Sequence, residues 1–416
     1  MAAGERQIAV DDARAAIAAA LKPLREAESV ALTAALGRVL AEDVVSPIDV
    51  PAHDNSAMDG YAFDGGQLAD GQELLLSSVG TLHAGAPFEG VVGPGQCLRI
   101  MTGAVMPVGL DTVIPLELCR AEGTQVRVPA GVIRPGENRR RQGEDLAAGK
   151  PALLRGRVLR PADLGLAASL GYTTLPVVRR LRVALFSTGN EVFAPGQPLP
   201  PGGIYDSNRF SLIGALQRLN MEVVDLGLVR DDPAALQATL EQALERADVV
   251  LTSGGVSAGD ADHTRDVLAR LGEVAFWKVA MRPGRPFAFG PLRSAATGRQ
   301  AWLFALPGNP VAALVTFYVF AREGLLQLAG AQPEPLPVLQ ARCTTAIRKR
   351  PGRTEFQRGT VFRADDGHWQ VRLSGYQGAG VLRSMSESNC LVVLGHDQGS
   401  VAAGEPVDVW LFDALV

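Results

Sequence analysis

Between residues 181 and 330, short apolar runs alternate with longer segments whose apolar positions recur at helical spacing. Such a run is typical of a buried strand, and helical spacing indicates a helix with one packed face. The predicted strands are residues 181–187, 222–228, 248–252, 273–280 and 301–306, and the predicted helices are residues 210–219, 233–246, 264–271 and 311–328. Repeated strand–helix units of this length predict a doubly wound, mostly parallel α/β sheet.

Short strands dominate the regions on either side. Residues 54–145 are rich in glycine and proline and predict a small all-β unit, with strands over residues 74–79, 97–101, 112–115 and 125–128. Helices over residues 8–22 and 161–171 and a strand over 173–178 flank this unit. The last part of the chain predicts a β-barrel or sandwich, with strands over residues 338–344, 356–363, 368–373, 390–394 and 406–411.

Composition narrows the class of protein. A chain of 416 residues is too long for one hydrophobic core, so we expect three or four domains. A net charge of −4 argues against nucleic acid as the main partner. Four cysteines without a CxxC spacing fit a reducing compartment rather than structural zinc. The first residues do not resemble a signal peptide, and the apolar run 311–321 is about half a membrane span, so we expect a cytoplasmic protein without a membrane partner.

The loop over residues 252–262, TSGGVSAGDAD, lies where a predicted strand gives way to a predicted helix. Glycines there let backbone N–H groups approach an anion, and the helix N-terminus adds a partial positive charge. Asp260 and Asp262 supply carboxylates that suit a metal ion or a sugar hydroxyl. The loop therefore indicates phosphate binding, with an ordinary capped turn as the alternative.

Three other polar loops follow strands of the same predicted sheet, at residues 187–191, 230–232 and 306–310. Ligands of open α/β sheets bind beyond the carboxyl ends of the strands, so we expect these loops to converge on one site. Lys278, Arg282 and Arg285 form a basic cluster, stiffened by prolines, that suits an oxyanion. The alternatives are a helix cap at 231–233, a rigid turn at 307–310 and a solvated basic loop.

Together with segments of the β-rich unit, these loops resemble the molybdopterin molybdenumtransferase family, of the MoeA and gephyrin E-domain type. The matching segments run in family order along almost the whole chain. They are DNSAMDGYA (54–62), RIMTGA (99–104), RRRQGEDL (139–146), STGNEV (187–192), YDSNR (205–209), TSGGVSAGDAD (252–262), FWKVAMRPGRPFAFG (276–290), LPGNP (306–310) and GRTEFQRG (352–359).

The resemblance implies a four-domain, elongated homodimer whose active site lies between the α/β domain of one subunit and the β-rich insertion of the other. The expected domains are a discontinuous linking domain (1–50 and 146–178), a β-rich insertion (51–145), an α/β molybdopterin-binding domain (179–330) and a C-terminal β-barrel (331–416). A molybdopterin adenylyltransferase would act immediately upstream.

The implied reaction joins molybdate to adenylylated molybdopterin with Mg²⁺ and releases AMP, so the ligand's own thiolates capture the metal. The expected catalytic residues are Asp59, Glu191, Asp231, Asp262, Lys278, Arg282 and Arg285, with Asp262 also as the magnesium ligand. The expected substrate-binding residues are Thr102, Asp206, Asn208, Ser253, Gly254, Gly255, Ser257, Pro307, Gly308, Pro310 and Arg353.

The chain departs from the family pattern at three places. Arg282 and Arg285 stand where the family usually has lysines, the segment 377–380 lacks a serine common there, and His263 replaces an aromatic residue. Molybdate and tungstate both remain open as the metal source. Two other functions are considered: adenylylation of molybdopterin, which a single small domain performs, and a gephyrin-type scaffold, which would carry a second α/β copy and a long linker.

Overall fold

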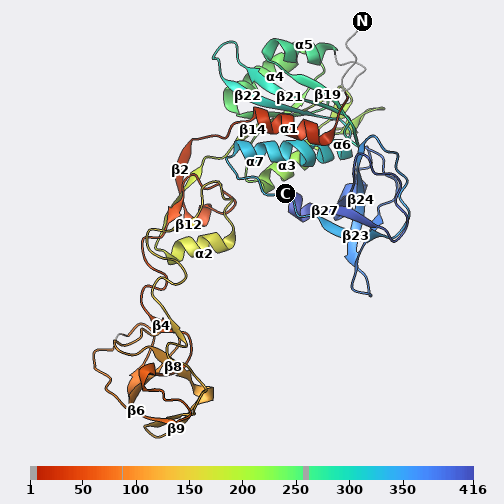
Figure 1. The fold of residues 1–416 in the computed structure, drawn as a ribbon. Coiled ribbons are helices and arrows are strands. Elements are labelled where there is room, and N and C mark those ends of the chain that lie inside the picture. Colours follow the sequence, from red (N-terminus) through yellow and green to blue (C-terminus); the bar gives the residue numbers. More distant parts are fainter. Residues whose placement is uncertain (1–6, 87, 256–261) are drawn as a thin grey trace.

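The computed structural model describes residues 7–86, 88–255 and 262–416, apart from the side chains of residues 262–266 and 276. The molecule is elongated (Figure 1). A layered α/β unit and a C-terminal barrel lie side by side at one end, and a β-rich unit lies at the other end. A slender connection carries the chain between them, so residues in the β-rich unit are remote from the α/β sheet of the same chain.

The central sheet has seven strands in the order β1-β19-β21-β22-β18-β14-β17. Their bounds are Gln7–Ile8, Ala275–Val279, Pro286–Arg293, Gln300–Leu306, Val249–Ser253, Arg182–Thr188 and Glu222–Val229. Neighbouring strands from β22 to β17 run parallel, as do β1 and β19. The expected doubly wound α/β unit is therefore confirmed.

Helices cover both faces of this sheet (Figure 1). On one face lie α1 (Val10–Ala20), α3 (Asn208–Arg218), α6 (Pro310–Thr316) and α7 (Arg322–Leu328). On the other lie α4 (Pro233–Arg246) and α5 (Asp262–Leu271). Each helix turns an apolar stripe to the sheet, which gives two separate hydrophobic cores.

The sequence did not predict strand β21, which runs antiparallel to both β19 and β22. Its apolar run begins at Pro286, directly after the prolines and arginines that indicated a loop. The predicted helix over 311–328 is present, but the turn Phe317–Ala321 in its middle is π-helical. Pro310–Leu328 is the one helix of the described chain long and apolar enough to cross a bilayer, and 78% of its most apolar 18-residue stretch is buried inside the protein. Packing in the core accounts for its apolar composition.

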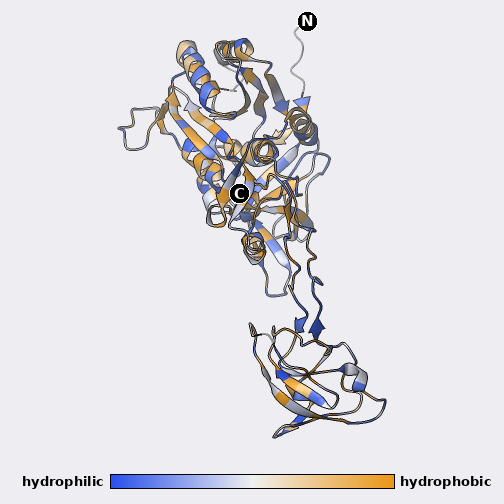
Figure 2. Ribbon diagram, turned by 90° about the vertical axis from the view of Figure 1, so that its left-hand side faces the viewer, coloured by the Kyte–Doolittle hydropathy of each residue, from blue (hydrophilic) through white to orange (hydrophobic). Residues whose placement is uncertain are grey.

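The β-rich unit is a six-stranded sheet in the order β8-β5-β7-β6-β10-β9. The bounds are Thr112–Pro115, Gly60–Phe63, Gln96–Ile100, Leu74–Leu82, Gln125–Val128 and Arg120–Glu122. Residues 49–56 and 138–148 run side by side into this unit and form what we call the neck, where β4 (Asn55–Ser56) pairs with β11 (Arg139–Arg140). Figure 2 shows these two short strands as hydrophilic.

Segments from both sides of the β-rich unit pair with each other beyond the neck. Strand β2 (Ala27–Ala31) pairs with β13 (Thr174–Val178), and β3 (Val44–Val45) pairs with β12 (Pro151–Leu153). Helix α2 (Pro161–Ser169) packs on them around a small core that includes Leu40 and Leu175. The β-rich unit is thus inserted into a structure that the chain starts before it and finishes after it.

The C-terminal unit is a closed barrel of five strands, β24-β25-β23-β27-β26, in which β26 pairs back with β24. The bounds are Thr354–Arg363, Trp369–Leu373, Leu339–Cys343, Cys390–Leu394 and Pro406–Leu411. A short strand that follows β19 of the α/β unit, β20 (Met281–Arg282), pairs in parallel with the start of β24. The expected barrel is confirmed, and one strand of the neighbouring unit is built into its sheet.

Replacing Phe320 with alanine should lower the free energy of unfolding of the α/β unit by about 3–5 kcal/mol. The ring is 1% exposed and stacks on Phe287 with 4.9 Å between centroids, so its loss leaves a cavity. Urea unfolding followed by the fluorescence of Trp277 and Trp302 measures the change. Phe210 is 51% exposed, and its replacement is the matched control. Equal losses in both variants would contradict this account of the core.

Candidate active site

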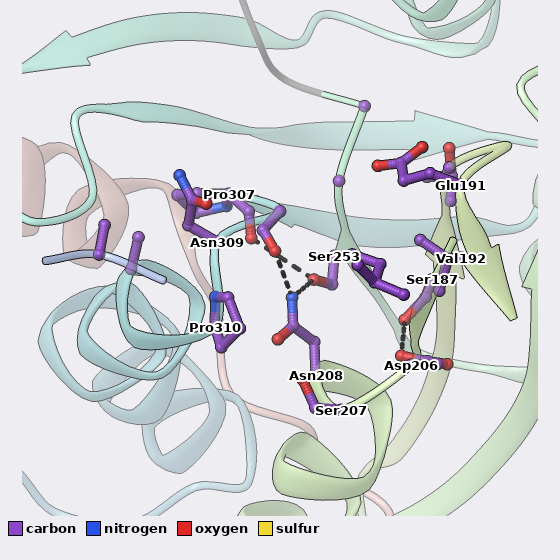
Figure 3. Close-up of a pocket in the computed structure, with 18 of the residues that line it drawn as sticks. Ser187, Glu191, Val192, Asp206, Ser207, Asn208, Ser253, Pro307, Asn309 and Pro310 are labelled. Atoms are coloured by element: carbon purple, nitrogen blue, oxygen red, sulfur yellow. Dashed lines mark hydrogen bonds between the residues drawn. The ribbon is translucent and has the colours of Figure 1, made fainter. Parts of the chain in front are cut away.

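A cavity of about 1140 Å³ opens beyond the carboxyl ends of β14, β18 and β22 (Figure 3). All four loops that follow strands in the sequence reach it, and so does the arginine-containing turn before β21. The lining consists mainly of residues 187–192, 204–208, 230–233, 253–255, 282–286, 307–310 and 376–379. The convergence of these loops, predicted from their positions after strands, is what a doubly wound sheet requires.

Asp206 anchors the floor of the cavity. Its carboxylate is 3% exposed, accepts a hydrogen bond from Ser187 Oγ at 3.0 Å and pairs with Arg209 Nε at 2.9 Å. Arg209 also pairs with Asp225 on β17. The carboxylate is therefore engaged with the protein on both sides, and its geometry suits holding the start of α3 in place.

Asn208 presents one unused acceptor to the cavity wall. Its amide nitrogen donates to Ser253 Oγ and to the Gly308 carbonyl, both at 2.7 Å. A carbonyl can only accept, so the nitrogen must face Gly308 and Oδ1 must point the other way. Oδ1 is buried and has no partner within the described chain. A ligand N–H or O–H group would satisfy it, since a buried acceptor left unpaired is costly.

The glycine-rich loop begins with a close approach of two backbones. Gly254 has φ of +97°, and a Cβ there would lie 2.5 Å from the Thr188 carbonyl oxygen, so the position demands glycine. Its N–H donates to the Leu306 carbonyl at 3.1 Å. Ser257 lies outside the described residues, as does the side chain of Asp262, whose backbone begins α5.

The opposite wall carries the arginines of the turn before β21. Arg282 and Arg285 are exposed, and neither guanidinium has a hydrogen-bond or ion-pair partner among the described residues. Gly284 between them has φ of +100°, and an added Cβ would lie 2.4 Å from Thr316 Oγ1. The Arg282–Pro283 peptide is cis. Two unneutralised cations on a turn fixed against α6 form a ready site for an oxyanion.

Two cations expected in the site lie beyond this lining. Lys278 is a half-buried residue of β19. Arg353 precedes β24 and pairs with Glu355 through its Nε at 2.8 Å. The structure therefore brings Arg282 and Arg285 together with the polar loops, and leaves Lys278 and Arg353 outside the described lining of the cavity.

The carboxylates Glu191 and Asp231 line the side of the cavity nearest β14. Asp231 accepts a hydrogen bond from Thr188 Oγ1, while Glu191 is exposed and points into the open space in Figure 3. The neighbouring Asp232 bonds Ala235 N at 2.8 Å and caps α4, so the cap interpretation holds for that residue. Within the described chain no three His, Cys, Asp or Glu side chains cluster as a metal site.

Asp59 and Thr102 lie in the β-rich unit, at the far end of the molecule from the cavity (Figure 1). The backbone N–H and the hydroxyl of Thr102 both donate to one oxygen of Asp59, each at 2.7 Å. These two hydrogen bonds lower the pKa of Asp59 below its ordinary value, and the N–H contributes more than the hydroxyl. This carboxylate is held as an anion on an exposed surface, separate from the other candidates of its own chain.

Sequence reasoning missed Arg358, although it quoted the motif that contains it. The side chain is 1% exposed and donates to Ser384 Oγ at 3.0 Å and to the carbonyls of Gln377 and Gly378 at 3.3 and 2.9 Å. Burial, followed by the charge of Arg282, lowers the pKa of Arg358 to about 10. The sequence carried a hint of this, because Arg358 lies two residues after Phe356 and so on the same face of β24, the face that packs against the core of the α/β unit.

Arg358 shapes the one cavity wall that comes from the barrel. The loop that it holds, residues 376–379, lines the cavity. The Ala379 carbonyl accepts from Val311 N at 2.9 Å and so occupies a free N–H of α6. The wall therefore keeps its position although the hydroxyl expected in this segment is missing.

Comparisons with known proteins agree with this arrangement. Residues 8–171 match the family described as MoeA N-terminal region (domain I and II), residues 184–327 the probable molybdopterin binding domain, and residues 340–412 the MoeA C-terminal region (domain IV). The molybdopterin molybdenumtransferase of Haemophilus influenzae is 41% identical, over 98% of this chain and 100% of its own. Molybdopterin molybdenumtransferase 2 of Mycobacterium tuberculosis is 39% identical, over 92% and 94%. The crystal structure of the molybdopterin biosynthesis moeA protein from Pyrococcus horikoshii OT3 superposes with a TM-score of 0.83 at 28% identity, covering 98% of this chain and 100% of its own.

Replacing Thr102 with valine should raise the pKa of Asp59 part of the way towards the ordinary value of about 3.9. The change removes the hydroxyl donor and keeps the N–H donor. Because the folded-state pKa of Asp59 is depressed, its stabilising contribution is present above the unfolded pKa and is lost as the pH falls through the folded pKa. NMR titration of the labelled carboxyl carbon measures this pKa. Thr102→Ser should keep it low, and an unchanged pKa in Thr102→Val would contradict the assignment.

Proposed function

Because the chain belongs to the molybdopterin molybdenumtransferase family, we propose that its cavity holds adenylylated molybdopterin beside molybdate. The chain is a transferase that inserts molybdenum during synthesis of the molybdenum cofactor. The observation that supports the detailed arrangement is that Arg282 and Arg285, which have no ion-pair partner among the described residues, line the same cavity as the loops at Gly254 and Gly308.

Each wall of the cavity suits a different part of the proposed substrates. The backbone around Gly254 and Gly255 suits the phosphate of the adenylylated substrate, because no side chain blocks the approach. Arg282 and Arg285 suit molybdate, a dianion that needs several fixed donors. The substrate's two dithiolene sulfurs bind molybdenum in place of oxygens that take up protons and leave as water, and a water molecule attacks the phosphoanhydride so that AMP leaves. The protein needs no nucleophile of its own, and it binds, orients and screens charge.

We propose magnesium as the metal ion that assists release of AMP. The described lining offers the carboxylates of Glu191 and Asp231, each of which keeps at least one oxygen without a hydrogen-bond partner among the described residues. One or two carboxylates together with phosphate oxygens form a usual magnesium donor set, so the residues present fit this ion. When bound, it would shield charge on the phosphate oxygens. Asp262 remains the further ligand predicted from the sequence.

We also propose a homodimer in which each active site is shared. Asp59 and Thr102 lie far from the cavity of their own chain, so a partner's β-rich unit would have to bring them to it. A molybdopterin adenylyltransferase would supply the substrate, and the cytoplasm is the proposed compartment. The similarity over 98% of the chain disfavours the single-domain adenylyltransferase and the scaffold as alternatives.

Arg282→Ala and Arg285→Ala should each raise the molybdate concentration that gives half-maximal AMP release by roughly 10–100-fold. Each change removes one charged donor, worth about 1.5–3 kcal/mol. The assay follows AMP release from adenylylated molybdopterin with magnesium and varied molybdate, and release should fall when magnesium is omitted. The double change to lysine should retain activity, because the charge is kept.

The matched control for these variants is Arg299→Ala. Arg299 is exposed in the turn before β22, at the end of that strand opposite the cavity. Its replacement should leave the molybdate requirement unchanged. Unchanged half-saturation in both Arg282→Ala and Arg285→Ala would remove these residues from the oxyanion site. No AMP release by the unmodified chain would remove the proposed reaction itself.

At a molybdate concentration far below the half-saturation of Arg282→Ala, mixing Asp59→Asn chains with Arg282→Ala chains should restore activity that neither variant shows alone under that condition. In a shared-site dimer, each mixed dimer contains one site with both residues intact, so random pairing should recover about a quarter of the unmodified rate. AMP release measured before and after subunit exchange tests this. Mixing Asp59→Asn with Thr102→Val should recover nothing, because both changes fall on the same half. A failure of the first mixture, in dimers shown by mass to have exchanged, would overturn the shared site.

A further inference from the structure

Two aromatic side chains, Tyr205 and Tyr376, are part of the described lining of the reaction cavity, and they come from different units of the protein. Tyr205 belongs to β16 (Ile204–Tyr205) of the α/β unit, which pairs with β15 (Val192–Phe193). Tyr376 belongs to the barrel segment 376–379. The two side chains are 46% and 80% exposed, so neither ring is packed in the protein core. The anion-binding loops and the arginine turn give neither ring a task.

The backbone around Tyr376 is fixed although its ring is exposed. Guanidinium nitrogens of the buried Arg358 donate to the carbonyls of Tyr376 at 3.4 Å and Gly378 at 2.9 Å. The side-chain amide of Gln377 donates to the Arg358 carbonyl at 3.0 Å and accepts from Arg358 N at 2.9 Å. The ring is therefore held out from an ordered backbone, which reduces the entropy lost when a ligand packs against it.

The ring of Tyr376 lies against the backbone of its own loop. A Cβ added at Gly378 would lie 2.4 Å from Tyr376 Cε1 and 3.0 Å from Cδ1, so glycine at this position leaves room for the ring. The Tyr376 hydroxyl has no hydrogen-bond partner among the described residues, whereas the Tyr205 hydroxyl donates to the Gln197 carbonyl at 2.8 Å. One side of the Tyr376 ring is thus supported, and most of its surface remains open to a ligand.

The segment that carries Tyr376 is next to the arginine turn. Arg358, whose guanidinium holds this segment, lies within electrostatic reach of Arg282. Arg282 lies on β20 and Arg358 on β24, the two strands that pair between the α/β unit and the barrel. Tyr376 therefore belongs to the end of the cavity proposed for molybdate. Tyr205 belongs to the side of Glu191, whose carbonyl accepts a hydrogen bond from β16 at 2.8 Å.

The proposed substrate has a flat ring system on each side of its phosphates. Adenylylated molybdopterin carries adenine at one end and a pterin at the other, and the dithiolene is joined to the pterin. Because molybdate is proposed to lie beside Arg282 and Arg285, the dithiolene and its pterin must come to the same end of the cavity. The ring nearest to Tyr376 is therefore the pterin.

We propose that Tyr376 is a stacking platform for the pterin of the substrate, and that it selects a flat heterocycle at the molybdate end of the cavity. The inference rests on the proposed function, because its ligand is the substrate of the proposed reaction. A phenol ring packs on a fused heterocycle through dispersion and π-stacking, without a particular set of hydrogen bonds. Tyr376 thereby supplies the apolar contact that the glycine loops and the arginines lack.

Calorimetric titration of the full chain with adenylylated molybdopterin, without molybdate, tests the platform. Tyr376→Ala should weaken binding roughly 5–150-fold, the range for loss of one stack between an aromatic side chain and a heterocycle. Tyr376→Phe should bind as the unmodified chain does, because the hydroxyl has no described partner. Trp369→Ala is the matched control, since Trp369 is 43% exposed on the same barrel and does not line the cavity. Equal affinity of Tyr376→Ala and the unmodified chain would overturn the platform.

Two fragments of the substrate separate its rings. Molybdopterin carries the pterin without adenine, and its binding should show the full loss in Tyr376→Ala. AMP carries adenine without a pterin, and its affinity should not change. The opposite pattern would place Tyr376 against adenine and overturn the assignment. Sedimentation of Tyr376→Ala should show the oligomeric state of the unmodified chain, and a changed state would make Tyr376 a contact between copies instead of a platform.

Failure of the platform and failure of the proposed reaction give different results. AMP release by the unmodified chain, together with unchanged substrate affinity in Tyr376→Ala, would keep the reaction and remove the platform. A chain that binds the substrate through Tyr376 but releases no AMP would keep the platform and lose the reaction. Half-saturation by molybdate should be the same in Tyr376→Ala as in the unmodified chain. A rise as large as the loss of substrate affinity would mean that the whole wall had moved, and would overturn a stacking role.

Discussion

The active site depends on the pairing of β20 with β24, which joins the α/β unit to the barrel. Arg282 lies opposite Glu355 in this pairing, and Thr354 N bonds the Ala280 carbonyl at 2.9 Å. Two backbones far apart in sequence thereby fix the arginine turn from one side, while Gly284 packs against Thr316 on the other. The cations of both units meet along this one seam, so the cavity is formed before any ligand arrives.

Positive charge collects along this pairing, and no described carboxylate pairs with Arg282, Arg285 or Arg358. Arg358 is buried within electrostatic reach of Arg282, and carbonyls and a hydroxyl, not carboxylates, accept its hydrogen bonds. Burying a charge costs several kcal/mol, which these hydrogen bonds offset only in part. Repulsion among Arg282, Arg285 and Arg358 adds to that cost. An incoming dianion relieves both terms, so part of its binding free energy is already stored in the fold.

Much of this site could be predicted from the sequence, because the apolar runs of the strands and the polar loops that follow them can be recognised there. The loops after β14, β17, β18 and β22 met as a parallel sheet requires, and Pro310 begins α6 as its rigid turn suggested. Strand β21 escaped notice because Pro286 obscured its start. Arg358 and the orientation of the Asn208 amide depend on burial and on carbonyls from distant segments, which spacing does not encode. The remoteness of Asp59 from the cavity depends on the neck, which no local pattern reveals.

The neck places the whole β-rich unit at the end of one narrow connection. Two antiparallel segments, paired at β4 and β11, form a narrow two-stranded ribbon between the β-rich unit and the rest of the molecule. A small change of angle at this ribbon would be magnified with distance, so Asp59 would move further than the ribbon itself. Because the ribbon is hydrophilic and hydrogen-bonded to itself, such bending exposes no apolar core. In the proposed shared site, bending of this short stretch of backbone would move Asp59 relative to the partner's cavity without disturbing the core of either folded end.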